Sequence, residues 1–118
     1  MEDKRQQCLE LLRDSEALGH YTALLGQLQK DFDRANVAFG FTADTRPETV
    51  YASLHEKMYQ LIMERFRDYL NVLYFVDIPE RSFRQVPLTD PVEVAAAVSY
   101  LILKREWQKI QMKLNSRP

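Results

Sequence analysis

The sequence predicts an all-α fold: a bundle of three to four main helices forming a single domain, residues 1–118. The chain has only 3 glycines, too few for the many tight turns of a β-sandwich or barrel. Long stretches keep apolar residues at helical spacing, and helix-starting signals separate these stretches. The composition, 46% hydrophobic and 28% charged, is typical of a globular domain that folds without disulfides or metal.

The N-terminal third predicts helices over about residues 2–17 and 21–38. In the second of them, apolar residues alternate three and four positions apart, which is the pattern of an amphipathic helix packed against partners. Gly19 favours a break between the two segments. One continuous helix remains an alternative.

A long third helix is predicted over about 46–76. Thr45-Arg46-Pro47-Glu48 matches a capping box at its start, and apolar residues keep helical period from Val50 to Leu73. Val72 to Val76 alone could form a strand. No second strand is predicted to pair with it, so we interpret it as the last buried turns of this helix.

The last helix is predicted over about 91–114. Asp90-Pro91-Val92-Glu93 combines an N-cap, a proline at the first position and an acid at the third. The following VEVAAAVSYLIL is apolar nearly all round, which predicts a central helix. The connection 77–89 is long for a helix–helix loop, and we expect a short helical turn near 79–84 within it.

The charge balance gives no reason to expect a polyanionic partner. With 16 basic and 17 acidic residues the net charge is −1, so no global field steers the chain to nucleic acid or an anionic membrane. A lone cysteine, Cys8, suits a reducing compartment. The first residues lack a signal-peptide pattern and no stretch is long enough to span a bilayer, so we expect a cytoplasmic protein with no membrane partner.

We find no motif for catalysis, a cofactor or a metal. The two histidines, His20 and His55, lack the Glu-x-x-His and His-x-x-x-His spacings of helical metal sites. The serines lie outside any nucleophile motif, and no glycine-rich phosphate loop is present. The chain is therefore predicted not to be an enzyme, although a pair of acids among its many carboxylates could still meet in the fold.

Two surfaces are candidates for binding. Arg105, Lys109 and Lys113 follow one face of the last helix and could contact an anion or nucleic acid, but cations also gather near helix C-termini because of the macrodipole. A protein-contact surface could form from the aromatic seam of the second helix and from the 77–89 loop. Its candidate residues are Tyr21, Phe32, Phe39, Phe83, Val86 and Leu88.

The segment LNVLYFVDIPE, followed by a last helix containing LILKREWQK, resembles a group of small uncharacterised bacterial proteins of the Bacteroidota. The resemblance covers roughly residues 66–113 and rests mostly on apolar residues. It implies bacterial origin and an all-helical domain, and it brings no activity or catalytic residue.

Three functions follow as hypotheses. The first is a non-enzymatic protein–protein interaction module, with a homodimer as one form. The second is a nucleic-acid-associated regulatory module that uses the C-terminal basic face. The third is a small-ligand binder or enzyme with a pocket between helices. The lack of any catalytic pattern favours the first.

Overall fold

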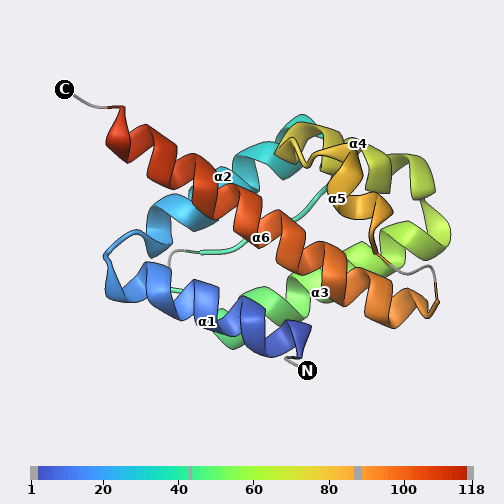
Figure 1. Ribbon diagram of the computed structural model, residues 1–118, viewed down its shortest axis with the longest axis horizontal. Helices are drawn as coiled ribbons and strands as arrows, with labels where there is room; N and C mark the ends of the chain where they lie inside the picture. Colours follow the sequence, from blue (N-terminus) through green and yellow to red (C-terminus); the bar gives the residue numbers. More distant parts are fainter. Residues whose placement is uncertain (1–2, 43, 87–88, 117–118) are drawn as a thin grey trace.

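The computed structural model describes residues 3–42, 44–86 and 89–116 and confirms the all-α class. Within these residues the chain forms helices and no strand (Figure 1). The helices are α1 (Lys4–Ala17), α2 (Tyr21–Arg34), α3 (Pro47–Glu64), α4 (Phe66–Val76), α5 (Glu80–Arg84) and α6 (Pro91–Asn115).

The last helix is the centre of the bundle, as its all-round apolarity predicted. Helix α6 crosses the whole molecule and contacts each of α1 to α5 (Figure 1). Its residues Ala95, Val98 and Ile102 are fully buried. Burial of these apolar side chains stabilises the fold through the hydrophobic effect.

Gly19 separates α1 from α2, so the N-terminal third of the chain forms two helices and not one continuous helix. Its φ of 77° lies in the left-handed region, which glycine adopts without steric cost. The amides of Gly19 and His20 donate to the carbonyls of Glu16 and Ser15, at 3.1 and 2.8 Å. This is the Schellman pattern that closes a helix C-terminus.

Helix α2 ends at Arg34, earlier than the predicted residue 38. Asn36 adopts a φ of 60°, and Val37 N–H donates to Phe32 C=O at 3.0 Å. Asparagine is the residue other than glycine that most readily takes this conformation. Phe39 therefore lies in the loop after α2 and not on its seam.

The predicted single helix over 46–76 is wrong, because the chain turns at Arg65. That residue has φ −141° and ψ 63°, outside the helical region. The turn lets α4 pack against α2 and α3, whereas a straight helix would carry its second half away from the bundle. Arg65 is neither glycine nor proline, so no local signal marks the break.

The predicted capping of α3 is wrong, whereas the predicted capping of α6 is confirmed. Thr45 and Glu48 do not form the expected capping box: Arg46 is the N-cap and makes no side-chain capping bond. Glu48 instead accepts from Arg13 at 2.6 Å. Asp90 does cap α6, because its carboxylate accepts from Val92 N–H at 2.9 Å.

The stretch from Val72 to Val76 is helical, as predicted, but only one side of it is buried. Val72, Leu73 and Val76 lie in the core, whereas 76% of Tyr74 is exposed. Helix α4 as a whole packs more against α2 and α3 than against α6. The short helix α5 confirms the turn predicted near 79–84.

Helix α4 ends through Asp77, which has φ 70° and ψ 53°. Ile78 N–H donates to Leu73 C=O at 3.0 Å, and the buried Ile78 side chain covers the helix end. The left-handed residue, more than the following proline, therefore stops the helix. Among the described residues, no helix is long and apolar enough to cross a membrane.

Candidate functional site

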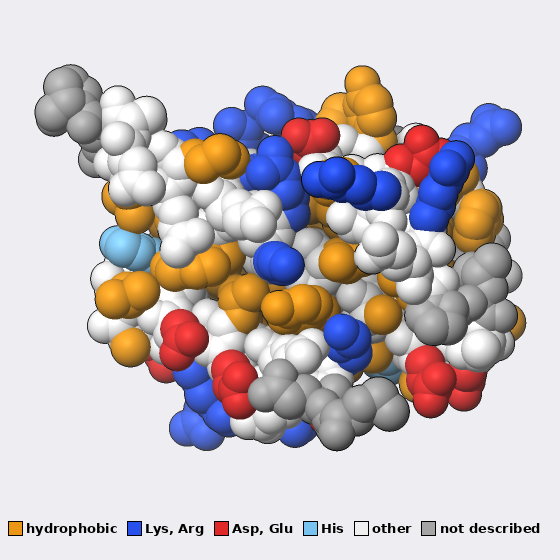
Figure 2. All heavy atoms as spheres, viewed as in Figure 1, with side chains coloured by type: hydrophobic (Ala, Val, Ile, Leu, Met, Phe, Trp, Pro, Cys, Tyr) orange, Lys and Arg blue, Asp and Glu red, His pale blue; other side chains and the backbone are white. Residues whose placement is uncertain are grey.

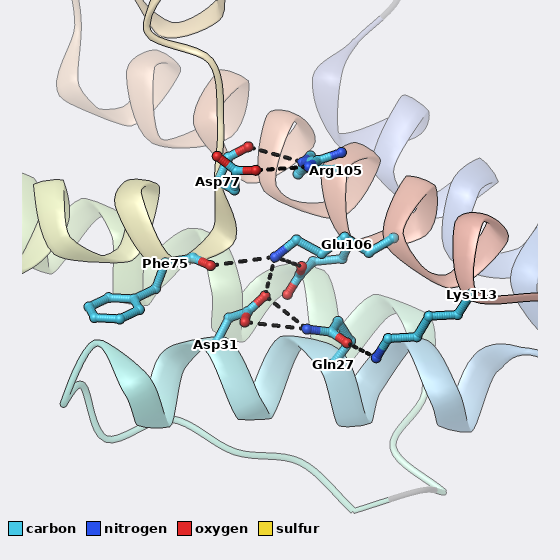
Figure 3. Close-up of polar contacts among 8 residues, drawn as sticks. Gln27, Asp31, Phe75, Asp77, Arg105, Glu106 and Lys113 are labelled. Atoms are coloured by element: carbon cyan, nitrogen blue, oxygen red, sulfur yellow. Dashed lines mark hydrogen bonds and ion pairs between the residues drawn. The ribbon is translucent and has the colours of Figure 1, made fainter. Parts of the chain in front are cut away.

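The three predicted anion contacts each hold an acceptor within the protein (Figure 3). Arg105 donates to the Asp77 carboxylate at 2.9 Å and to the Asp77 carbonyl at 3.0 Å. Lys109 contacts Asp31 Oδ2 at 2.7 Å, and Lys113 donates to Gln27 Oε1 at 2.7 Å. The basic face of α6 therefore joins α6 to α2 and to the end of α4.

Lys109 is the hub of a partly buried cluster between α2 and α6, which we call the α2–α6 polar cluster: Gln27, Asp31, Glu106, Lys109 and Lys113. The side chains of Asp31 and Glu106 are fully buried, and that of Lys109 is 16% exposed. Lys109 Nζ lies 3.2 Å from Glu106 Oε1. Gln27 Nε2 donates to both oxygens of Asp31 at 3.3 Å.

The pKa values of the two carboxyls in this cluster are shifted in opposite directions. Burial, reinforced by the adjacent Asp31, raises the pKa of Glu106 to about 8, although Lys109 opposes the rise. Burial also pushes the pKa of Asp31 upward, but hydrogen bonds with Glu106, Lys109 and Gln27 outweigh it and lower that pKa below its usual value. At neutral pH one ammonium thus faces one carboxylate and one carboxylic acid.

The hydrogen bonding of Glu106 agrees with a protonated side chain. Among the described residues, neither Glu106 oxygen accepts a hydrogen bond with good geometry. A carboxylate there would have the Lys109 ammonium 3.2 Å from its Oε1 but no well-formed hydrogen bond from a described residue to offset its desolvation. A carboxylic acid can instead donate its proton to Asp31. The cluster can therefore hold a proton on Glu106.

An open groove of about 450 Å³ lies over the cluster. Two residue stripes of the same helical spacing line it, one on α2 and one on α6. They are Gln27, Lys30, Asp31 and Arg34, and Lys109, Met112, Lys113 and Ser116.

Two of the predicted protein-contact residues are core residues, so that part of the prediction is wrong. Tyr21 is 7% and Phe32 0% exposed, because the seam of α2 packs inward. The Tyr21 hydroxyl donates to the Thr45 carbonyl. Phe39 is half-buried, with its ring 4.6 Å from that of Phe32.

Two other predicted contact residues, Phe83 and Val86, lie near the surface of the 77–89 connection. Phe83 and Val86 are half-buried against the core. Leu88 lies outside the described residues. Phe83 is the member of this set that the fold places beside a larger apolar surface.

That surface, the α4–α5 face, consists of Phe66, Leu70, Tyr74 and Phe83. The first three follow one side of α4 at four-residue spacing and are 55%, 43% and 76% exposed. Figure 2 shows apolar side chains rising at the upper edge of the molecule, where α4 lies, with Lys and Arg side chains beside them. The sequence carried the signal in this spacing, but the same spacing also predicts a buried helix face.

Two hollows flank this face. One, of about 290 Å³, lies among Phe66, Tyr69, Leu70 and Phe83. The other, of about 420 Å³, lies among Leu70, Tyr74, Ile78 and Phe83. Leu70 and Phe83 line both, so protruding apolar side chains alternate with apolar hollows.

The histidines and the cysteine have internal roles. His20 packs against Trp107, with ring centroids 5.9 Å apart, and His55 Nε2 lies 2.9 Å from the Val92 carbonyl oxygen. Burial raises the pKa of the Cys8 thiol to about 12, which keeps it unreactive. Over the described residues, no three His, Cys, Asp or Glu side chains gather in a way that could hold a metal ion.

Comparison of the chain with protein-family models, with curated proteins and with solved structures finds no match. The resemblance of residues 66–113 to small bacterial helical proteins therefore stays a prediction.

Proposed function

We propose that this protein is a helical interaction module that self-associates through the α4–α5 face. The observation that carries the proposal is the exposed stripe of Phe66, Leu70 and Tyr74. Scattered apolar residues are ordinary on a protein surface, but large side chains that gather on one face mark interaction sites. Tyrosine and phenylalanine are also enriched at the centres of protein interfaces.

The shape of the face favours a second copy of the chain as its occupant. Protruding rings and apolar hollows lie on the same surface, so one copy carries both halves of the complementary shape. A two-fold axis near Leu70 would run the two α4 helices antiparallel. It would set Leu70 against Leu70 and place Tyr74 of each copy against Phe66 of the other, as an isologous interface requires.

The charges at the two ends of the face fit the same arrangement. Glu64 is the last residue of α3, just before α4, and Arg81 lies on α5, which follows α4 in the chain. Neither has an ion-pair partner within the described part of the chain. Antiparallel packing would bring Glu64 of one copy toward Arg81 of the other, adding specificity at the rim.

The experiment is sedimentation equilibrium over a wide concentration range, with Leu70→Glu and Tyr74→Glu as variants. We expect the natural chain to form dimers and both variants to be monomeric, because a buried unpaired carboxylate is costly. Leu18→Glu is the matched control: Leu18 is 61% exposed at the end of α1, on another element. Circular dichroism shows that each variant still folds.

Charge exchange tests the orientation of the pair. Glu64→Arg alone should weaken the dimer, and adding Arg81→Glu should restore it, because the pairing is then reversed. A natural chain that remains monomeric at the highest concentration, or a dimer that Leu18→Glu disrupts as much as Tyr74→Glu, would overturn the proposal.

A further inference from the structure

We infer that the groove between α2 and α6 is a binding site for a small phosphorylated molecule. Three cations line it without a carboxylate partner among the described residues: Lys30, Arg34 and Lys113. The chain as a whole has a net charge of −1. The positive charge here is therefore a local concentration and not a general property of the surface.

The acid in the groove does not cancel these cations. Asp31 lines the groove, but Lys109 Nζ contacts its Oδ2 at 2.7 Å and Gln27 donates to both its oxygens. This carboxylate is thus engaged by its own counter-ion, Lys109, which lines the groove beside it. The positive charges of Lys30, Arg34 and Lys113 therefore remain without a counter-ion in the part of the chain that the structure describes. A concave site concentrates the electric field of such charges, which attracts anions.

The arrangement of the cations costs stability when no anion is present. Lys30 and Arg34 lie four positions apart on α2, and like charges at this spacing repel each other. The helix macrodipole accounts for Arg34 in the last turn of α2 and Lys113 in the last turn of α6. It does not account for Lys30, which lies further from the helix end.

The donors fit a phosphate group. Arg34 offers a planar fork that matches two phosphate oxygens. Lys113 uses one donor on Gln27 Oε1 and keeps two more for a ligand. A volume of about 450 Å³ accommodates one or two phosphate groups, with Met112 as an apolar wall for the rest of the molecule.

A small ligand fits better than a nucleic-acid strand. The next cations along α6, Lys109 and Arg105, are paired with Asp31 and Asp77. A strand needs a continuous row of available cations to follow its backbone. Of the cations that line the groove, Lys30, Arg34 and Lys113 lack a carboxylate partner among the described residues, and Lys109 has one.

The test is an NMR titration of the full chain with inorganic pyrophosphate at about 0.15 M salt, where weak surface attraction is screened. We expect saturable shifts of the amides in 27–34 and 109–116. Arg34→Gln and Lys113→Gln should each raise Kd at least about tenfold, the effect of losing one charged hydrogen bond. Arg34→Lys should recover part of the affinity because it keeps the charge but not the fork.

Lys104→Gln is the control, since Lys104 is an exposed lysine of the same helix that does not line the groove. Shifts that rise linearly without saturation, or equal losses in Lys104→Gln and Lys113→Gln, would overturn the inference. A second arm uses a single-stranded oligonucleotide of mixed sequence. Tighter binding of this strand at the same residues would replace the small ligand with an extended polyanion and also overturn it.

Discussion

Lys109 Nζ lies 2.7 Å from Asp31 Oδ2, an ion pair between residues 78 positions apart that joins α6 to α2. Asp31 is fully buried, so its charge depends on this ammonium and on Gln27. The pair therefore favours one specific alignment of α6 against α2. A shift of α6 along α2 by one turn would leave a buried carboxylate without its partner.

Lys109→Met should therefore destabilise the protein by about 3 kcal/mol, because it leaves an uncompensated charge in the core. Chemical denaturation measures the free energy of unfolding. Lys104→Met is the control, since Lys104 is exposed and makes no ion pair with a described residue. Equal effects of the two substitutions would contradict a structural role for the Lys109–Asp31 pair.

The stability of the protein should fall as pH rises from about 4.5 to about 8. The pKa of Glu106 is raised from 4.5 to about 8 in the folded chain, so over this range the folded state binds a proton that the unfolded state has lost. The free energy of unfolding should decrease by up to about 1.4 kcal/mol per pH unit. Asp31 does not change the pH dependence of the free energy of unfolding in this range. Its pKa is lowered in the folded chain, so the stability that its carboxylate contributes is lost only at acidic pH.

Glu106→Gln should remove this slope and stabilise the protein above neutral pH, because the amide stays uncharged and can still donate to Asp31. Denaturation curves at several pH values compare the two chains. A variant that keeps the slope of the natural chain would show that another group holds the proton.

Two alanine substitutions of glycine should have opposite effects. Gly19 has φ 77°, and a Cβ there meets no other atom within 4 Å, so the strain of the left-handed backbone alone should cost about 1 to 2 kcal/mol. Gly26 lies inside α2, also with space for a Cβ, and alanine there should stabilise by up to about 1 kcal/mol. Thermal unfolding of the two variants measures both effects. A stabilising effect of Gly19→Ala would contradict the assigned end of α1 at Gly19.

Asp77 offers a third backbone test. Its φ of 70° favours a residue that tolerates the left-handed region, so Asp77→Asn should change stability little, whereas Asp77→Ala should cost about 1 kcal/mol. The ion pair with Arg105 contributes less, since 76% of the Asp77 side chain is exposed. Equal losses for the two variants would show that the carboxylate, and not the backbone, is decisive.

The candidate sites were only partly predictable from the sequence. Arg105, Lys109 and Lys113 stood out as a helical row of cations, but the carboxylates they face come from elsewhere in the chain. Glu106 did carry a signal that sequence reasoning missed: it lies four positions from both Ile102 and Ile110, on the buried stripe of α6. An acid at such a position predicts a buried polar contact, although it does not identify Asp31 as the partner.

The sequence by itself determined the all-helical class, the cap at Asp90 and the central place of the last helix, and it favoured a break at Gly19 without deciding it. Each depends on backbone conformation or periodicity within a few residues, which a local pattern records. Only the tertiary structure decided the turn at Arg65, the meeting of Asp31 with Glu106 and Lys109, and which apolar stripe stays uncovered. Tyr21 and Phe32 are buried while Phe66 and Tyr74 are exposed, although all four lie on apolar helix faces, because burial depends on which helices pack together across the fold.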